Sequence, residues 1–229
     1  MNIFGIEKSS FIDYPNKIST VIFTGGCNFR CPYCHNTSIV KQEGEMISEK
    51  EAITFLIKRK RFIDAVCITG GEPTLQPDLY QFISVLKKEG FSVKLDTNGT
   101  RPHVLTNLIE DKLLDYVAMD IKAPFTKYSN VVDQRVDTNY IESSIDLLHN
   151  SDIDYEFRTT VCKELLNKED IISIAMAIKG SRRFYIQNFR DVDTVLVGKN
   201  KLTPYELHEL EIIRDEIKDL FGVCEIRGK

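Results

Sequence analysis

Two patterns of hydrophobic and polar positions alternate along most of this chain. Short runs rich in β-branched and apolar residues are typical of buried strands, and longer segments with apolar residues at helical spacing separate them. The short runs predict strands at residues 18–24, 65–69, 91–97, 116–121, 156–161 and 184–189, and a short edge strand at 223–226. The longer segments predict helices at residues 48–61, 77–89, 102–111, 140–148, 168–178 and 204–221. Ser48 and Glu51 have the spacing of a capping box at the start of the first helix.

This alternation of strands and helices predicts the fold class. Strands joined by helices of this length form a parallel sheet with right-handed crossovers. We therefore expect an α/β fold with parallel strands and outer helices, either doubly wound or curled into a partial barrel of six β/α units. All 229 residues fit a single domain, because α/β barrels of more than about 200 residues occur without splitting. Its core is expected at about residues 18–189, followed by a C-terminal helix and short strand at 203–227.

Composition and charge narrow the possible partners. With 42% hydrophobic and 28% charged residues the chain has the composition of an ordinary soluble globular protein. No apolar run approaches the roughly 18 to 20 residues that span a bilayer. Thirty basic against 34 acidic side chains give a net charge of −4, which argues against binding to DNA or RNA. We expect a cytoplasmic protein without a membrane or nucleic-acid partner.

One basic cluster and three isolated cysteines have structural explanations. Residues 58–61, Lys-Arg-Lys-Arg, suit the C-terminus of a helix, although they could also be a docking patch for an acidic electron donor. Cys67, Cys162 and Cys224 lie singly in apolar stretches, so we expect them to be buried strand residues. The cysteine usage is consistent with a reducing compartment.

The other three cysteines cluster in the loop after the first predicted strand, with the spacing Cys27-x3-Cys31-x2-Cys34. Iron-sulfur clusters in electron carriers usually have four cysteine ligands, whereas catalytic metal sites keep one coordination position open. Three thiolates without a fourth therefore favour a catalytic iron-sulfur cluster.

Three other interpretations of these cysteines are open. The last two alone have the Cys-x-x-Cys spacing of a thiol-disulfide redox motif, which leaves Cys27 unused. Adding His35 gives the attachment pattern of a c-type haem, which requires export, and the polar residues 1–8 contain no signal peptide. A structural zinc site made of the three cysteines and His35 would usually take its ligands from two separated pairs.

Glycine-rich and polar segments follow the predicted strands, at the edge where parallel α/β sheets place their sites. After the second strand, residues 70–73 are Gly-Gly-Glu-Pro, which allow close backbone approach and bring the carboxylate of Glu72. Asp96 and Thr97 bring oxygen ligands after the third strand, and Asn98-Gly99 has the sequence of a turn. A simple strand-to-helix turn explains residues 70–73 equally well.

Charged residues also lie on the later strands. Asp120 and Lys122 share one face of the fourth strand and could form an interior ion pair. Arg158 and Gln187 alternate with apolar neighbours on the fifth and sixth strands, so both could face inward. A structural pair of Arg158 with Glu156 or with an aspartate is an alternative.

The cysteine motif followed by Gly70-Gly71-Glu72-Pro73 resembles the radical S-adenosylmethionine (SAM) superfamily. Within that superfamily, Cys-His-Asn at 34–36, Leu-Asp-Thr-Asn-Gly at 95–99 and Asp-Ile-Lys at 120–122 resemble the glycyl-radical-enzyme activases. The whole-chain pattern is most similar to the activating proteins of anaerobic ribonucleoside-triphosphate reductases. The resemblance extends from about residue 10 to residue 189.

This resemblance implies a single radical SAM domain with a partial barrel, and a reaction. Cys27, Cys31 and Cys34 would bind a 4Fe-4S cluster whose open iron is chelated by SAM. One electron from a donor such as flavodoxin or ferredoxin would split SAM into methionine and a 5′-deoxyadenosyl radical. That radical would take a hydrogen from a glycine Cα of a partner glycyl radical enzyme.

The resemblance also implies which residues contact SAM. Tyr33 would pack on adenine, residues 70–73 would receive the methionine ammonium, and Lys122 would meet the carboxylate with Arg158 nearby. The complete set of cofactor contacts that it implies is Tyr33, Gly70, Gly71, Glu72, Pro73, Asp96, Thr97, Asn98, Lys122, Arg158 and Gln187. A possible monovalent-cation site consists of Asp96, Thr97, Met119 and Asp120.

The chain departs from the activase pattern at several positions. Asn16 stands where glycine is common, and asparagine tolerates a positive φ better than most residues. The histidine that approaches the ribose in pyruvate formate-lyase activase has no clear counterpart, and Gln187 is the candidate substitute. A ferredoxin-like insert is absent, because there is no second cysteine group.

Two other functions are consistent with the motifs. A radical SAM enzyme acting on a small molecule, such as a 7-carboxy-7-deazaguanine synthase, would commonly carry an aspartate after the third cysteine, where this chain has His35-Asn36. The other function is a non-catalytic iron-sulfur electron carrier. Formation of 5′-deoxyadenosine separates the enzymes from the carrier.

Overall fold

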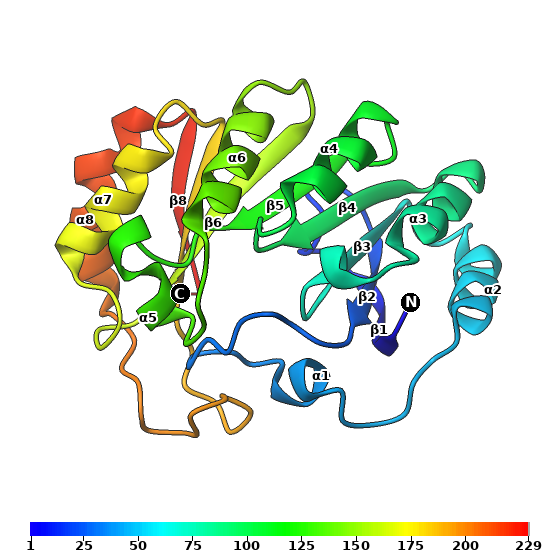
Figure 1. Ribbon diagram of the computed structural model, residues 1–229, viewed down its shortest axis with the longest axis horizontal. Coiled ribbons are helices and arrows are strands. Elements are labelled where there is room, and N and C mark those ends of the chain that lie inside the picture. The colour runs from blue at the N-terminus through cyan, green and yellow to red at the C-terminus, as the bar shows by residue number, and fades with distance from the viewer. Residues whose placement is uncertain (229) are drawn as a thin grey trace. The chain divides into compact units, whose positions relative to one another are not determined.

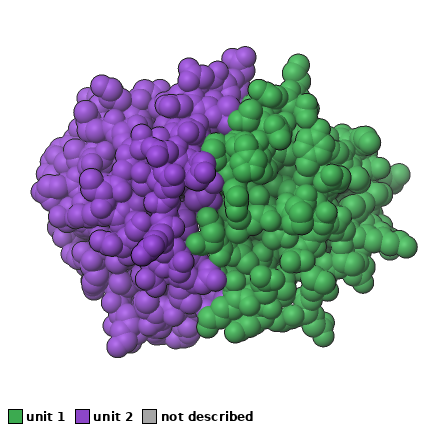
Figure 2. Space-filling view, in the orientation of Figure 1, with its two compact units in different colours: residues 1–28, 38–97, 101–118 green, residues 29–37, 98–100, 119–229 purple. Residues whose placement is uncertain are grey.

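The computed structural model of the protein describes residues 1–228. Within it the chain divides into two compact units, shown in different colours in Figure 2. Unit 1 comprises residues 1–28, 38–97 and 101–118, and unit 2 comprises residues 29–37, 98–100 and those from 119 onward. Both units are built from strands and helices that alternate along the chain.

The strands form an eight-stranded sheet whose spatial order follows the chain. They are β1 (Ile3–Ser10), β2 (Ser19–Thr24), β3 (Ala65–Gly70), β4 (Ser92–Thr97), β5 (Tyr116–Asp120), β6 (Asp154–Val161), β7 (Arg183–Asn188) and β8 (Val223–Arg227). β1 is antiparallel to β2, whereas β2, β3 and β4 are mutually parallel, as are β6, β7 and β8. The predicted α/β fold class with parallel strands is confirmed.

In unit 1, helices α2 (Glu49–Arg59), α3 (Leu79–Lys88) and α4 (Pro102–Glu110) connect the strands (Figure 1). The predicted capping box at the start of α2 is present, because Ser48 Oγ accepts from the Glu51 amide and the Glu51 carboxylate accepts from the Ser48 amide. Helix α3 buries one face at helical spacing, consisting of Leu79, Phe82, Ile83 and Leu86. This helix packs against β4.

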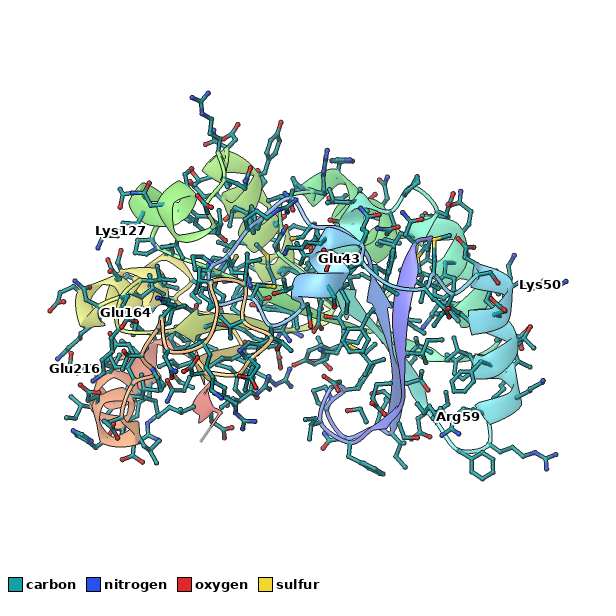
Figure 3. The ribbon with its side chains drawn as sticks, turned by 90° about the horizontal axis from the view of Figure 1, so that it is seen from below. Glu43, Lys50, Arg59, Lys127, Glu164 and Glu216 are labelled. Carbon is teal, nitrogen blue, oxygen red and sulfur yellow. The ribbon has the colours of Figure 1, made fainter. Side chains whose placement is uncertain are left out.

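The end of α2 is fixed to the first strand. Arg59, labelled in Figure 3, donates from Nη2 to Ser9 Oγ at 2.7 Å. Lys58 and Arg59 lie in the last turn of this helix, where positive charge is favourable, so the structural interpretation of the basic cluster at residues 58–61 is confirmed.

In unit 2, helices α5 (Tyr128–Val131), α6 (Thr138–His149), α7 (Lys168–Ala177) and α8 (Leu207–Ile217) accompany the strands. Asn167 and Asp170 form a capping box at the start of α7. The core of this unit contains fully buried rings of Phe157 on β6 and Phe184 on β7. Helix α8 adds Leu210, Ile213 and Ile217 to it.

The structure adds elements that the sequence patterns did not predict. Strand β1 was missed because its buried, half-buried and exposed positions do not alternate regularly, and Gly5 interrupts it. The short helices α1 (Thr37–Lys41) and α5 are too brief to show helical periodicity. The last predicted helix, residues 204–221, is shorter in the structure, where α8 is followed by a 3₁₀ turn at Lys218–Leu220.

The isolated cysteines mostly follow the prediction. Cys67 is buried on β3 and Cys162 is buried directly after β6, whereas Cys224 on β8 is only half-buried. Burial raises the pKa of the Cys162 thiol to about 11. Within residues 1–228, no helix combines the length and the apolar character needed to cross a membrane.

Candidate functional site

The Gly-Gly-Glu-Pro segment follows β3 and packs backbone against backbone on the end of β2. A Cβ atom at Gly71 would lie 1.8 Å from the Gly26 carbonyl oxygen, and one at Gly70, where φ is +112°, would lie 2.5 Å from the Thr24 nitrogen. The Gly71 amide donates to the Thr24 carbonyl at 2.8 Å, and the Glu72 amide donates to the Gly26 carbonyl at 2.9 Å. Only glycine fits at both positions, and these contacts fix the segment that leads into the cysteine loop.

Glu72 is buried and organises this turn. Its Oε1 accepts from the Thr74 amide at 3.0 Å and from Thr97 Oγ1 at 2.7 Å. It also caps the 3₁₀ turn Pro73–Leu75. The end of β3 is thereby joined to the end of β4, as expected for parallel strands. Thr74 was missed by sequence reasoning, and a threonine in a turn gave no signal for it.

Asp96 lies on β4 with its carboxylate paired to the ammonium of Lys94. Thr69 Oγ1 donates to its Oδ2 at 3.3 Å. The side chains of Lys94 and Asp96 are 3% and 11% exposed, so this is an interior ion pair. Sequence reasoning missed Lys94, although its alternation with Asp96 on a predicted strand places both on one face.

In unit 2 a reverse turn shapes the second half of the cysteine loop. The Cys34 amide donates to the Cys31 carbonyl at 3.0 Å. The segment at residues 190–197 holds this turn from outside: the Leu196 amide donates to the Cys34 carbonyl at 3.0 Å, and the Val197 amide to the Pro32 carbonyl at 3.2 Å. Residues 190–197 are irregular, so no periodicity pointed to this role.

His35 is held by the same segment. Its Nε2 lies 2.8 Å from the Arg190 carbonyl oxygen, and its ring packs against Phe189 with centroids 5.8 Å apart. Thr37 Oγ1 donates to the Thr194 carbonyl at 2.8 Å. The histidine thus has a structural position beside the cysteines.

Cys31 and Tyr33 are buried within unit 2. Burial raises the pKa of the Cys31 thiol, and the nearby Lys122 ammonium opposes that rise. Burial also raises the pKa of Tyr33. Lys122 Nζ lies 5.8 Å from the centre of the Tyr33 ring, within the range of a cation-π contact. The Lys122 ammonium therefore supplies a positive charge close to Cys31.

Asp120, Lys122 and Arg158 form a three-membered ion cluster. Asp120 Oδ1 accepts from Arg158 Nε at 2.8 Å, and its Oδ2 accepts from Lys122 Nζ at 3.0 Å. Burial would raise the pKa of Asp120, but Arg158 and Lys122 lower it to about 2. Burial likewise opposes the charge of Lys122, yet Asp120 raises the pKa of that ammonium above its ordinary value. The predicted Asp120–Lys122 pair is confirmed, and the partner of Arg158 is an aspartate.

Tyr128 stabilises the strand end that carries this cluster. Its hydroxyl accepts from the Lys122 amide at 3.1 Å, and burial raises its pKa. Its ring packs against Phe29 with centroids 6.1 Å apart. This tyrosine lies on a four-residue helix and had no pattern that could have identified it.

The remaining predicted residues have the following places. Asn98 Oδ1 accepts from the Thr100 amide at 3.1 Å, which confirms the turn, and Gly99 has a φ of +75°. Gln187 Oε1 accepts from Thr160 Oγ1 at 3.4 Å. Asn16 has a φ of 60°, so the turn that glycine would favour is formed with asparagine. The ribose assignment of Gln187 stays a prediction.

The chemistry of the cysteine thiols suits an iron-sulfur cluster, whose usual ligands are cysteine thiolates. Within residues 1–228 all six cysteines are thiols, and three of them lie on one loop held by backbone hydrogen bonds. Among the same described residues, no three His, Cys, Asp or Glu side chains converge as they would around a single metal ion. A cluster places each thiolate on a different iron atom, so wider spacing of the thiols is compatible with it.

Comparisons with known proteins agree with these motifs. The family model described as "Radical SAM superfamily" matches residues 21–178. A protein of Methanocaldococcus jannaschii named "Putative glycyl-radical enzyme activating enzyme" is 42% identical, over 99% of this chain and 97% of its own length. The pyruvate formate-lyase-activating enzyme of Clostridium pasteurianum is 32% identical over 52% of each chain.

Solved structures share the fold. Streptococcus suis SuiB bound to S-adenosylmethionine superposes with a TM-score of 0.72 at 16% identity. The alignment covers 90% of this chain and 49% of that one. TYW1 with a lysine-pyruvate adduct bound superposes with a TM-score of 0.61 at 17% identity, over 88% of this chain and 73% of that one.

Proposed function

This chain belongs to the radical SAM superfamily, and within it to the glycyl-radical-enzyme activating enzymes; from that premise we propose that it activates an anaerobic ribonucleoside-triphosphate reductase. Members of the superfamily use a 4Fe-4S cluster and SAM, and the glycyl-radical-enzyme activating enzymes among them are oxidoreductases. The observation that carries the activase assignment is the 42% identity, over 99% of the chain, to a protein named a putative glycyl-radical enzyme activating enzyme. The motifs at residues 34–36, 95–99 and 120–122 support an activase, and the choice of partner rests on the whole-chain resemblance to the activating proteins of anaerobic ribonucleoside-triphosphate reductases.

We assign the cluster to Cys27, Cys31 and Cys34. When bound, the cluster and SAM supply one-electron cleavage of the sulfonium, which provides the radical that takes hydrogen from a glycine Cα. The chain itself supplies binding, orientation and exclusion of water. The Lys122 ammonium near Cys31 favours the thiolate form, which is the form that binds iron.

We assign SAM binding to the strand ends. The glycines at 70 and 71 let this turn pack against the backbone at the end of β2, while Glu72 holds the turn through Thr74 and Thr97. Lys122 and Arg158 are held in place by Asp120 and offer positive charge for a carboxylate. The complete set of SAM contacts proposed is Tyr33, Gly70, Gly71, Glu72, Pro73, Asp96, Thr97, Asn98, Lys122, Arg158 and Gln187.

The carboxylates of the monovalent-cation site that the resemblance implies already have protein cations as partners. Asp96 already pairs with Lys94, and Asp120 already pairs with Lys122 and Arg158. Each carboxylate therefore has positive charge from the protein itself, and no step of the proposed reaction is assigned to a bound cation.

The test is electron paramagnetic resonance with the candidate partner. The reconstituted, reduced protein is mixed anaerobically with SAM and the anaerobic reductase of the same organism. We expect 5′-deoxyadenosine and the doublet of a glycyl radical on the reductase. A Cys31→Ser variant is the control, and it is expected to give neither product.

Other outcomes would assign other functions. A doublet on pyruvate formate-lyase alone would mean that the protein is an activase with pyruvate formate-lyase as its partner. Production of 5′-deoxyadenosine without a radical on any glycyl radical enzyme would favour a small-molecule substrate. Absence of 5′-deoxyadenosine with an intact cluster would indicate an electron carrier. Flavodoxin and ferredoxin can be compared as donors in the same assay.

A further inference from the structure

A lysine ammonium lies in the interior of unit 1, on the same strand as a proposed SAM contact. Lys94 is 2% exposed, and its Nζ pairs with Asp96 Oδ1. The same nitrogen lies 3.8 Å from Cys67 Sγ and 5.9 Å from the centre of the Tyr116 ring. Cys67 is directly opposite Lys94 in the β3–β4 register, so the strand pairing fixes these neighbours.

Such an ammonium is costly to bury without a counter-charge. Removing a charged amine from water costs several kcal/mol, which a well-placed carboxylate can offset. Asp96 provides that carboxylate, and Thr69 Oγ1 holds its other oxygen at 3.3 Å. The positive charge beside Asp96 is therefore supplied by a lysine of the protein and not by a cation from solution.

We infer that the Lys94 ammonium is a built-in cation that neutralises and orients the Asp96 carboxylate, so that SAM binding requires no alkali-metal ion at this position. The inference rests on the proposed role of the β4 end, Asp96 and Thr97, in SAM binding. Thr97, the residue after Asp96, donates from Oγ1 to the Glu72 carboxylate. The position of Asp96 is therefore coupled to the Gly-Gly-Glu-Pro turn. Lys94 is thus a positioning residue.

The experiment compares SAM affinity in potassium and in choline chloride at equal ionic strength. For the reconstituted protein we expect affinities equal within about twofold, because the internal ammonium leaves no cation to bind. In Lys94→Met the affinity in choline should fall, and potassium should restore it by about 5- to 150-fold, the usual range of coupling between two ligand sites. Methionine keeps the unbranched, flexible side chain, one heavy atom shorter, and removes the ammonium group.

A second readout does not depend on SAM or on the cluster. Thermal unfolding of the cluster-free protein should be unaffected by exchanging choline for potassium, whereas Lys94→Met should be stabilised by potassium. Lys60→Met is the matched control, because Lys60 has a partner, Glu89, at 3.9 Å on the surface. Its Tm is expected to be the same in the two salts. A Lys94→Met/Asp96→Asn double variant, which has no charge to neutralise, should also be insensitive.

Specific results would overturn the inference. A tenfold or greater gain in SAM affinity of the unmodified protein in potassium would mean that it binds an external cation. A folded Lys94→Met variant that does not respond to potassium would mean that the ammonium is structural only. If no SAM binding occurs in any salt, the proposed function fails, while the unfolding comparison still decides the role of Lys94.

Discussion

At the scale of single residues, the ion cluster of Asp120, Lys122 and Arg158 shows how buried side chains in unit 2 remain charged. One carboxylate serves two cations through different oxygen atoms, at 2.8 and 3.0 Å. Burial disfavours each charge by itself, and only mutual pairing offsets that penalty. The three side chains are therefore interdependent, and changing one alters the protonation and position of the others.

The pH dependence of stability follows from the pKa of Asp120, which is lowered from 3.8 to about 2. A carboxyl group with a lowered pKa in the folded protein stabilises it above pH 4, and this contribution is lost as the pH falls from about 4 to about 2. The shift corresponds to about 2 kcal/mol of the free energy of unfolding. Urea unfolding at a series of pH values should show Asp120→Asn less stable at pH 7 and less sensitive to acid.

Asp154→Asn is the control for that series. Asp154 is 57% exposed and pairs with Arg183 at 3.4 Å, so its pair is screened by solvent. Its removal should leave the acid dependence unchanged. If Asp120→Asn had the same dependence on pH as the unaltered protein, the ion cluster would not be the source of the acid sensitivity.

At the scale of elements, the sequence predicted the strands and helices that have strong periodicity and a marked start. An apolar run specified β3 because most of this strand is buried, and the Ser48–Glu51 capping box specified the start of α2. Strand β1 could not be found in this way, because it is partly exposed and its pairing with β2 is interrupted by irregularities. Pairing with a neighbouring strand defines it, and a single sequence does not show that neighbour.

The turn after β3 depends on the absence of a side chain at residue 71. Gly71→Ala would place a methyl group 1.8 Å from the Gly26 carbonyl oxygen, so the β2 end must shift. Overpacking of this kind costs about 1 to 3 kcal/mol, and we expect that loss in urea unfolding together with weaker SAM binding. Gly5→Ala is the control, since its methyl group would lie at an ordinary 3.5 Å from Phe23. Equal effects of the two substitutions would contradict the proposed close packing.

At the scale of the whole molecule, the candidate site was predictable where chemistry and spacing coincide in the sequence. The three cysteines and Gly70-Gly71 are recognised by residue type alone, and strand alternation places Asp120 beside Lys122. The residues that hold the predicted site residues in place were identified only from the structure. They are Lys94, which pairs with Asp96, Tyr128, which accepts from the Lys122 amide, and residues 190–197, which donate to the cysteine turn. The contacts of residues 190–197 join segments far apart in sequence, where no local pattern records the pairing.

Other long-range contacts join the C-terminal strand to the rest of unit 2. Arg227 on β8 binds Glu156 through two hydrogen bonds of 2.8 and 3.0 Å, and its guanidinium lies 3.3 Å from the centre of the Tyr185 ring. Glu156 is 1% exposed, so without Arg227 it would be a buried carboxylate lacking this partner. Because the Arg227 side chain is 37% exposed, solvent screens the pair, and its loss should cost less than the roughly 3 to 5 kcal/mol of a fully buried pair.

A chain ending at Phe189 therefore tests whether the radical SAM core of this protein is self-sufficient. It retains residues 21–178, which match the family model, but lacks β8, α8 and the backbone donors of Leu196 and Val197. We expect it to lose cooperative unfolding, measured by circular dichroism, because α8 buries three apolar side chains and Arg227 neutralises Glu156. Adding residues 190–229 as a separate peptide should restore part of the transition. A truncated chain that unfolds cooperatively and still binds SAM would contradict this expectation. It would mean that the core is stable by itself and that the contacts to Glu156 and to the cysteine turn add little to its stability.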